Sequence, residues 1–161
     1  MSLEILRADY TDPQHATDLV FLLNAYAEDP MGGGDPLSAY VKENLASNIA
    51  GIPHAFSILA YIDGQPAGLV NCFEGFSTFH CKPLINVHDV VVVQQFRGQG
   101  LSLQMLDRVE AIARARGCCK LTLEVLEGNP VAQNAYRKFG LDGFELDPEH
   151  GRALFWQKVL D

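Results

Sequence analysis

Arg97, Gly98, Gln99 and Gly100 form a polar turn whose residue types suit the binding of a phosphate or pyrophosphate group. The turn follows four valines, residues 90–93, and precedes a segment with apolar residues at helical spacing. The first amides of a helix have no partner within the helix, and the helix dipole is positive there. Glycine lets the backbone approach a ligand closely, and Arg97 adds a planar donor with a fixed positive charge. The order of strand, glycine turn and helix predicts an anion site, a pattern that many nucleotide and cofactor folds share.

Two polar residues, His88 and Asp89, interrupt the apolar run before this turn. A histidine, with an ordinary pKa of about 6.5, can act as a general base near neutral pH. The alternative is a core histidine whose hydrogen bonds are satisfied. In a regular strand neighbouring side chains point to opposite faces, so we expect Asp89 to face away from His88. We interpret Asp89 chiefly as a structural carboxylate, with substrate binding as the alternative.

The elements that must position these residues follow from the patterns in the rest of the chain. Asp12-Pro13 predicts a helix start, Asp63-Gly64 a hairpin turn, and Gly140 a helix end. We expect helices from residue 13, over 37–49, from 101 to near 117, and over 131–139. We expect strands over 3–9, 55–62, 67–76, 87–93, 120–126, near 144–146, and over 153–159. The hairpin gives antiparallel pairing and the strand–helix–strand unit gives parallel pairing. The sequence therefore predicts an α/β (α+β) fold, a mixed sheet with helices on both faces, in one domain over residues 1–161.

Composition limits the possible partners. The chain has 161 residues, of which 48% are hydrophobic and 20% charged, as in an ordinary globular domain. No apolar run approaches the roughly 20 residues that span a bilayer, and the first ten residues lack the pattern of a secretory signal, so we expect a cytoplasmic protein. The net charge of −8 argues against nucleic acid or an anionic membrane as partner and suits a cationic substrate such as an amine.

The four cysteines do not have the spacing of a metal site, and we expect reduced thiols and no bound metal. They are Cys72, Cys81, Cys118 and Cys119. Reduced thiols are the usual state in the cytosol.

Two motifs together resemble the GNAT superfamily of acetyl-CoA-dependent N-acetyltransferases. The family pattern R/Q-x-x-G-x-G/A is similar to residues 97–102, with Ser102 at the last position. The pattern N-x-x-A-x-x-x-Y-x-x-x-G is matched by Asn129, Ala132, Tyr136 and Gly140. The resemblance covers nearly the whole chain and implies a mostly antiparallel GNAT-like sheet of about six to seven strands.

The resemblance also implies acetyl-CoA as co-substrate and a set of residues that bind it. The backbone of the valine strand would hold the pantetheine arm where the neighbouring strands splay apart, and an amide near Val92 would donate to the carbonyl oxygen. The turn amides would hold the pyrophosphate, while Asn129 would either bond the cofactor or cap the next helix. The expected cofactor-binding residues are Val90, Val91, Val92, Val93, Arg97, Gly98, Gln99, Gly100, Leu101, Ser102, Asn129 and Tyr136.

Residues 75–92 further resemble the polyamine and diamine acetyltransferase branch, which has Glu-Asp where this chain has His88-Asp89. The resemblance implies direct attack by a primary amine, with His88 as possible base and Tyr136 as proton donor to the CoA thiolate. A small-molecule or peptide amine would be the acceptor, and the family suggests a homodimer. The candidate acceptor contacts are Tyr26, Glu28, Asp29, Glu74, Phe76 and Asp89.

Two other classes remain open at this point. A dinucleotide-binding dehydrogenase would need glycine or alanine at Leu103 and more parallel strand–helix units. A non-catalytic acyl-CoA sensor or interaction module could use the same fold. His88 and Tyr136 favour the enzyme.

Overall fold

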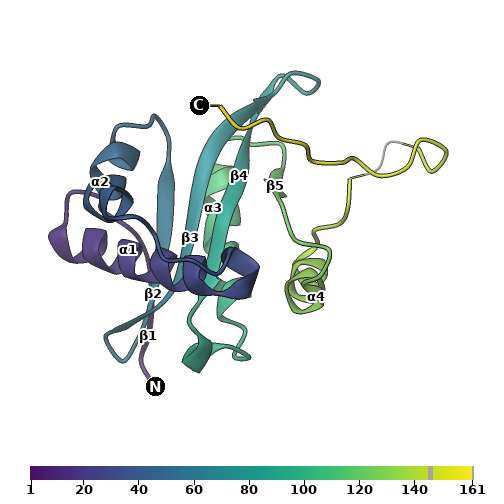
Figure 1. Ribbon diagram of the computed structural model, residues 1–161. Helices are drawn as coiled ribbons and strands as arrows, with labels where there is room; N and C mark the ends of the chain where they lie inside the picture. Colours follow the sequence, from purple (N-terminus) through teal and green to yellow (C-terminus); the bar gives the residue numbers. More distant parts are fainter. Residues whose placement is uncertain (145–146, 161) are drawn as a thin grey trace.

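An open sheet of five strands forms the centre of the described part of the chain, residues 1–144 and 147–160 of a computed structural model (Figure 1). The strands are β1 (Leu3–Arg7), β2 (Phe56–Ile62), β3 (Gln65–Ser77), β4 (Lys82–Val92) and β5 (Leu121–Leu123). Their order along the sheet is β1-β2-β3-β4-β5. The first four strands pair antiparallel, and β5 pairs parallel to β4. This confirms the predicted mixed, mostly antiparallel sheet.

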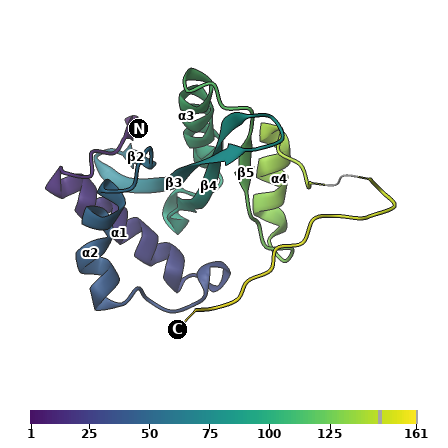
Figure 2. The ribbon, with the colours of Figure 1, turned by 90° about the horizontal axis from the view of Figure 1, so that it is seen from above.

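Helices cover both faces of the sheet, as the sequence predicts (Figure 2). They are α1 (Pro13–Glu28), α2 (Ala39–Ala50), α3 (Leu101–Ala115) and α4 (Pro130–Phe139), with short 3-10 turns η1 (Pro30–Gly32) and η2 (Gln94–Phe96). Helices α1 and α2 lie on one face, α3 on the other, and α4 beside α3 (Figures 1 and 2). Among the described helices, none is long and apolar enough to cross a membrane.

The predicted helix and turn signals act as their chemistry requires. The Asp12 carboxylate accepts from two amides at the start of α1, at 2.8 and 3.2 Å, with Pro13 as the first helical residue. Asp63 and Gly64 have φ of 50° and 77°, the positive values that a tight hairpin turn needs. Gly140 ends α4 with φ of 107°.

The sheet separates two apolar clusters. On the α1 face, Leu59, Leu69 and Val91 pack against Leu19 and Leu22 of α1. On the other face, alternate strand residues pack against α3, and the fully buried members of this cluster include Ile58, Val70, Cys72, Ile85, Met105, Leu106 and Val109. Period-two alternation along the strands therefore assigns each side chain to one face.

The predicted count of six to seven strands is wrong for the described residues. The segment predicted as a strand over 153–159 is extended chain whose apolar side chains are exposed. Phe144 belongs to no strand, and Leu146 lies outside the described residues. The strand predicted over 120–126 is shortened to three residues. Alternation shows which side chains could share a face, but a strand also needs a neighbour for its backbone hydrogen bonds.

Candidate functional site

A β-bulge in β4 places His88 and Asp89 on the same face of the sheet. The register between β3 and β4 shifts after Asn71, which pairs with Asp89 and leaves His88 without a partner. Asn71 donates to the Asp89 carboxylate at 3.0 Å, and the His88 ring meets the edge of Phe73 at 5.3 Å between centroids. Asn71 and Phe73 lie two residues apart on one strand, so they share a face. The prediction that Asp89 faces away from His88 is therefore wrong, because the bulge adds a residue to the strand.

Beyond the bulge, one edge of β4 has no neighbouring strand in the described chain. β4 pairs with β5 only from Ile85 to Val87, and the chain then leaves the sheet toward α4 (Figure 1). The Val92 carbonyl accepts a hydrogen bond from Arg97 Nε at 2.9 Å. After Val87 the backbone of β4 therefore has no strand partner on the β5 side within the described residues, and the Val92 carbonyl is bonded by the Arg97 side chain.

The glycine turn that follows β4 has the geometry of an anion cradle. Gly98 and Gly100 have φ of 80° and 76°, which side chains other than glycine rarely adopt. Gly100 begins α3 and offers no side-chain cap, so the first amides of this helix have no side-chain acceptor there. The turn from Gly98 to Gly100 is exposed. These residues fit a bound pyrophosphate.

Two carboxylates act electrostatically on Tyr26 of α1, which in turn acts on Tyr136 of the second motif. Burial raises the pKa of Tyr26, and the negative charges of Asp89 and Asp29 raise it further. Burial also raises the pKa of Tyr136 to about 12, with Tyr26 as a smaller cause. Charge effects thus link four residues predicted for the site, from α1, the loop after it, β4 and α4, which we call the Tyr26 group: Tyr26, Asp29, Asp89 and Tyr136.

Asp29 connects the loop after α1 to the glycine turn. Its carboxylate accepts from the Met31 amide at 2.9 Å and from Arg97 Nη2 at 3.1 Å. The Met31 hydrogen bond, followed by the Arg97 guanidinium, lowers the pKa of Asp29. The predicted cofactor turn and the predicted acceptor loop are thus joined by a direct ion pair.

Two of the other predicted acceptor contacts, Glu74 and Phe76, lie apart from this group, while Glu28 directly precedes Asp29. Glu74 pairs with Arg116 at 3.2 Å, at the end of α3 and therefore on the face opposite Tyr26. Phe76 is 58% exposed two residues further along β3. Glu28 accepts from Asn24 at 3.1 Å on the surface of α1.

Asn129 adopts one of the two roles predicted for it. Its side-chain oxygen accepts from the Ala132 amide at 3.2 Å and caps α4. This capping fixes the start of the helix that carries Tyr136.

The sequence reasoning missed Ser57 and Asn71, which lie beside Asp89 in the sheet. Both are buried polar residues, and a chain of hydrogen bonds joins them to the carboxylate. Their signal was a polar residue inside the apolar part of each of two strands, Ser57 between Phe56 and Ile58, and Asn71 between Val70 and Cys72.

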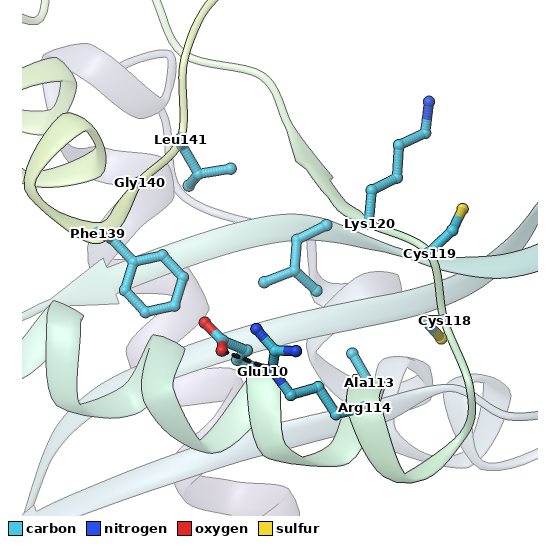
Figure 3. A pocket seen from close by; sticks show the side chains of 10 residues that line it. Glu110, Ala113, Arg114, Cys118, Cys119, Lys120, Phe139, Gly140 and Leu141 are labelled. Atoms are coloured by element: carbon cyan, nitrogen blue, oxygen red, sulfur yellow. Dashed lines mark hydrogen bonds and ion pairs between the residues drawn. The ribbon is translucent and has the colours of Figure 1, made fainter.

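Two hollows flank the fold without containing the Tyr26 group. One, of about 300 Å³, lies between α3, β5 and α4, and its lining includes Cys118 and the ion pair of Glu110 and Arg114 (Figure 3). Burial raises the pKa of the Cys118 thiol, which disfavours a nucleophilic thiolate there. The second, of about 500 Å³, lies against the end of β4 and includes Phe21 and Val93.

In residues 1–144 and 147–160 there is no group of three side chains placed to hold a metal ion.

Residues 19–141 match the family model described as the acetyltransferase (GNAT) family. The bovine thialysine N-epsilon-acetyltransferase is 34% identical over 83 residues, which cover 48% of this chain and 48% of that protein. The mouse protein of the same name is 34% identical over 56 residues, or 35% of this chain and 33% of that protein. The chain thus spans about half, or less, of the length of these curated relatives.

Solved structures with the same fold cover almost the whole chain. A probable acetyltransferase has a TM-score of 0.79 at 21% identity and covers 98% of this chain and 99% of its own. An aminoglycoside N-acetyltransferase in complex with CoA has a TM-score of 0.74 at 17% identity, covering 98% and 95%. At these identities the likeness establishes the fold.

Proposed function

The chain belongs to the GNAT acetyltransferase family, and from that premise we propose that it transfers an acetyl group from acetyl-CoA to a primary amine. The observation that carries the proposal is the open edge of β4 after Val87, which leads directly into the glycine turn and the uncapped start of α3. An extended thioester arm can lie along the strand while its pyrophosphate lies on the turn. The bovine relative is named for acetylation of an amine on thialysine, which supports an amine acceptor.

The cofactor would be held mainly by backbone groups. The backbone of Val90–Val93 would bond the pantetheine arm, and the amides from Gly98 to Ser102 would donate to the pyrophosphate. Arg97 would add its charge to the same anion, although in the structure its guanidinium bonds Asp29 and the Val92 carbonyl. Bound acetyl-CoA supplies an activated acetyl group with a thiolate leaving group.

His88 is our candidate for the base that takes the ammonium proton, directly or through water. A primary amine of pKa about 10.4 must lose a proton at pH 7, at a cost on the order of 4.6 kcal/mol. His88 is exposed beside Phe73 and shares a face with Asp89, so an amine approaching that face can reach it. An amide near Val92 would stabilise the charge on the carbonyl oxygen as the new N–C bond forms.

Tyr136 would give a proton to the CoA thiolate as the C–S bond breaks. Burial raises its pKa to about 12, so the phenol is protonated at neutral pH. Transfer to a thiolate of pKa about 8.5 is then uphill by roughly 4.8 kcal/mol. A turnover of about 10 s⁻¹ corresponds to a barrier of about 16 kcal/mol, so this cost is compatible with catalysis.

The part of the site where we expect the amine acceptor carries two negative charges. The negative charges of Asp29 and Asp89 both raise the pKa of Tyr26, and two carboxylates favour a cationic amine over a neutral or anionic acceptor. We therefore propose a small-molecule or peptide amine as acceptor. A homodimer in the cytoplasm, without nucleic acid or a membrane as partner, remains part of the proposal.

The test is acceptor-dependent release of CoA thiol from acetyl-CoA. The amine panel should include thialysine, a diamine, an aminoglycoside and a peptide with a free N-terminus, with an assay lacking amine as control. We expect release only when a suitable amine is present, and a loss of rate in His88→Ala that is largest at low pH. Unchanged turnover and pH profile in that variant would remove the base role from His88.

The alternative is a non-catalytic acyl-CoA sensor on the same fold. Acetyl-CoA binding measured by calorimetry, without release of CoA on any amine of the panel, would favour the sensor. Absence of any binding would overturn both functions.

A further inference from the structure

A row of polar side chains crosses the otherwise apolar α1 face of the sheet and ends at Asp89. Ser57 of β2 and Asn71 of β3 are cross-strand partners, and Asn71 and Asp89 of β4 are the next pair. Ser57 Oγ lies 2.6 Å from Asn71 Oδ1, and Asn71 Nδ2 lies 3.0 Å from Asp89 Oδ2. At the other end, Tyr10 Oη lies 2.8 Å from Ser57 Oγ. One hydrogen-bonded row thus connects the loop after β1 to the bulge in β4.

The donors in this row all point toward Asp89. The carboxylate accepts from the amide of Asn71, so the amide oxygen of Asn71 faces Ser57 and accepts the hydroxyl proton. Ser57 has only one hydroxyl proton, which is used in that bond, so Tyr10 must donate to Ser57. Hydrogen bonds aligned in one direction polarise one another and strengthen the last one. The row therefore fixes the direction of the Asn71 amide and, through it, the position of Asp89 Oδ2.

Packing alone does not account for these residues. Ser57 is 0% and Asn71 is 2% exposed, and their neighbours on this face include Leu59, Leu69 and Val91. A buried polar group costs free energy unless its partners are present, and apolar pairs of similar volume are often as stable or more stable. Here every buried side-chain polar atom of the described residues has a partner. A fully satisfied row of this kind restricts the group at its end to one geometry.

The end of the row lies where the acceptor is expected. Asp89 is half-buried, adjacent to the bulged His88, and close enough to Tyr26 to raise its pKa. Within residues 1–144 and 147–160, no donor bonds Asp89 Oδ1. One oxygen of the carboxylate is thus held by the sheet, and the other can accept from a ligand.

We propose that Tyr10, Ser57 and Asn71 are positioning residues that hold the Asp89 carboxylate toward the ammonium group of the acceptor. The proposal rests on the amine acetyltransferase function proposed above and assigns the cation-binding group within that site. Asn71 acts directly on Asp89, Ser57 fixes the Asn71 amide, and Tyr10 fixes the Ser57 hydroxyl. Their effect on turnover passes through the binding of the amine and leaves acetyl-CoA binding unchanged.

The test uses the full chain with Tyr10→Phe and Ser57→Ala, which remove only hydroxyl groups. The matched control is Tyr61→Phe, because the Tyr61 hydroxyl donates to the Asp18 carboxylate at 2.7 Å on the same face, in a pair separate from Asp89. Steady-state KM and kcat are measured for the best amine of the panel, such as thialysine, together with KM for acetyl-CoA. Thermal unfolding of each variant reports the loss of stability.

We expect Tyr10→Phe to raise the amine KM about 3-fold and Ser57→Ala about 10-fold, each with KM for acetyl-CoA unchanged. Tyr61→Phe should lower the unfolding temperature by a similar amount and leave the amine KM within 2-fold of the unsubstituted protein. An amine KM that stays unchanged in both row variants, or that rises equally in the Tyr61 control, overturns the proposal.

The outcome is separable from a failure of the proposed function. If the unsubstituted protein releases no CoA with any amine, the transferase function fails first. Amine binding is then measured directly by calorimetry on the protein with CoA. Equal amine affinity in Ser57→Ala and in the unsubstituted protein would overturn the positioning role there as well.

Discussion

The guanidinium of Arg97, directly after η2, lies 3.1 Å from the carboxylate of Asp29, in the loop after α1. The pair joins the turn that fits a pyrophosphate to the loop that flanks the Tyr26 group. Arg97 also donates to the Val92 carbonyl, so both of its bonds lie where a cofactor is expected. Binding of acetyl-CoA would therefore compete for Arg97 and alter the contact that holds the acceptor loop.

Asp29→Asn should strengthen acetyl-CoA binding and weaken amine binding. The ion pair is exposed and contributes about 1 kcal/mol or less, so releasing Arg97 should lower the Kd for acetyl-CoA by roughly 2- to 5-fold. Loss of a carboxylate near Tyr26 should raise the amine KM. Calorimetry gives the first value and steady-state kinetics the second, with Arg97→Ala as the control that weakens acetyl-CoA about 10-fold. A weaker acetyl-CoA complex in Asp29→Asn would contradict the competition.

Tyr136→Phe should lower kcat without changing the Kd for CoA. The substitution removes the hydroxyl but keeps the ring that packs against the α3 cluster. Loss of a general acid typically reduces the rate by about 10²-fold or more. Single-turnover transfer followed in a rapid-mixing instrument isolates this step from CoA release. A variant with wild-type single-turnover rate would leave Tyr136 with a packing role only.

Much of the fold could be predicted because local chemistry decides it. Asp12, Asp63-Gly64 and Gly140 act as caps and turns in the structure just as their side chains and backbone freedom require. The valine run and the glycine turn were placed correctly for the same reason. These features depend on contacts within a few residues.

The features that could not be predicted depend on pairing between distant segments. The bulge at His88 arises from the register of β4 against β3, which no pattern within β4 encodes. The row from Tyr10 to Asp89 joins four segments. The sequence shows the polar residues inside the strands, but it does not show which residues they bond to. Likewise, alternation in residues 153–159 carried no information on whether a neighbouring strand was available.

Alkaline pH should reduce the stability that Tyr136 contributes. Its folded pKa is about 12, against 10.0 for an unperturbed tyrosine, because burial disfavours the phenolate. Between these values the unfolded chain binds fewer protons than the folded one, so the free energy of unfolding falls as pH rises. The contribution, on the order of 3 kcal/mol, is complete below pH 10 and is mostly lost by about pH 12.

Urea unfolding at pH 8 to 12 measures this effect, with Tyr136→Phe as the control that lacks the phenol. The stability of the variant should fall less steeply across this window than that of the unsubstituted protein. Parallel curves for the two proteins would mean that Tyr136 ionises normally in the fold.

Trp156 should report whether the C-terminal segment is covered in solution. It is the only tryptophan of the chain and is 83% exposed, with Leu154 and Phe155 exposed beside it. We expect emission like that of tryptophan in water and strong quenching by acrylamide, independent of protein concentration. Blue-shifted emission that reverts on dilution would show that another copy of the chain covers this segment.

Gly68→Ala should destabilise the contact between β3 and α3. A Cβ on Gly68 would lie 2.7 Å from Met105 Cε and 3.2 Å from the Val91 carbonyl oxygen. The methionine can move, but the backbone carbonyl is fixed in the sheet, so we expect a loss of about 1–3 kcal/mol in the free energy of unfolding. Gly143→Ala is the matched control, because its Cβ would meet no atom within 4 Å.

A double variant tests whether Gly68 and Met105 constrain each other. Met105→Ala alone should cost about 2–5 kcal/mol in the free energy of unfolding, because it leaves a cavity. In the variant that carries both Gly68→Ala and Met105→Ala, the new methyl group fills part of that space. Urea unfolding should therefore give a loss of stability smaller than the sum of the two single losses. An additive result would show that Gly68 and Met105 do not constrain each other.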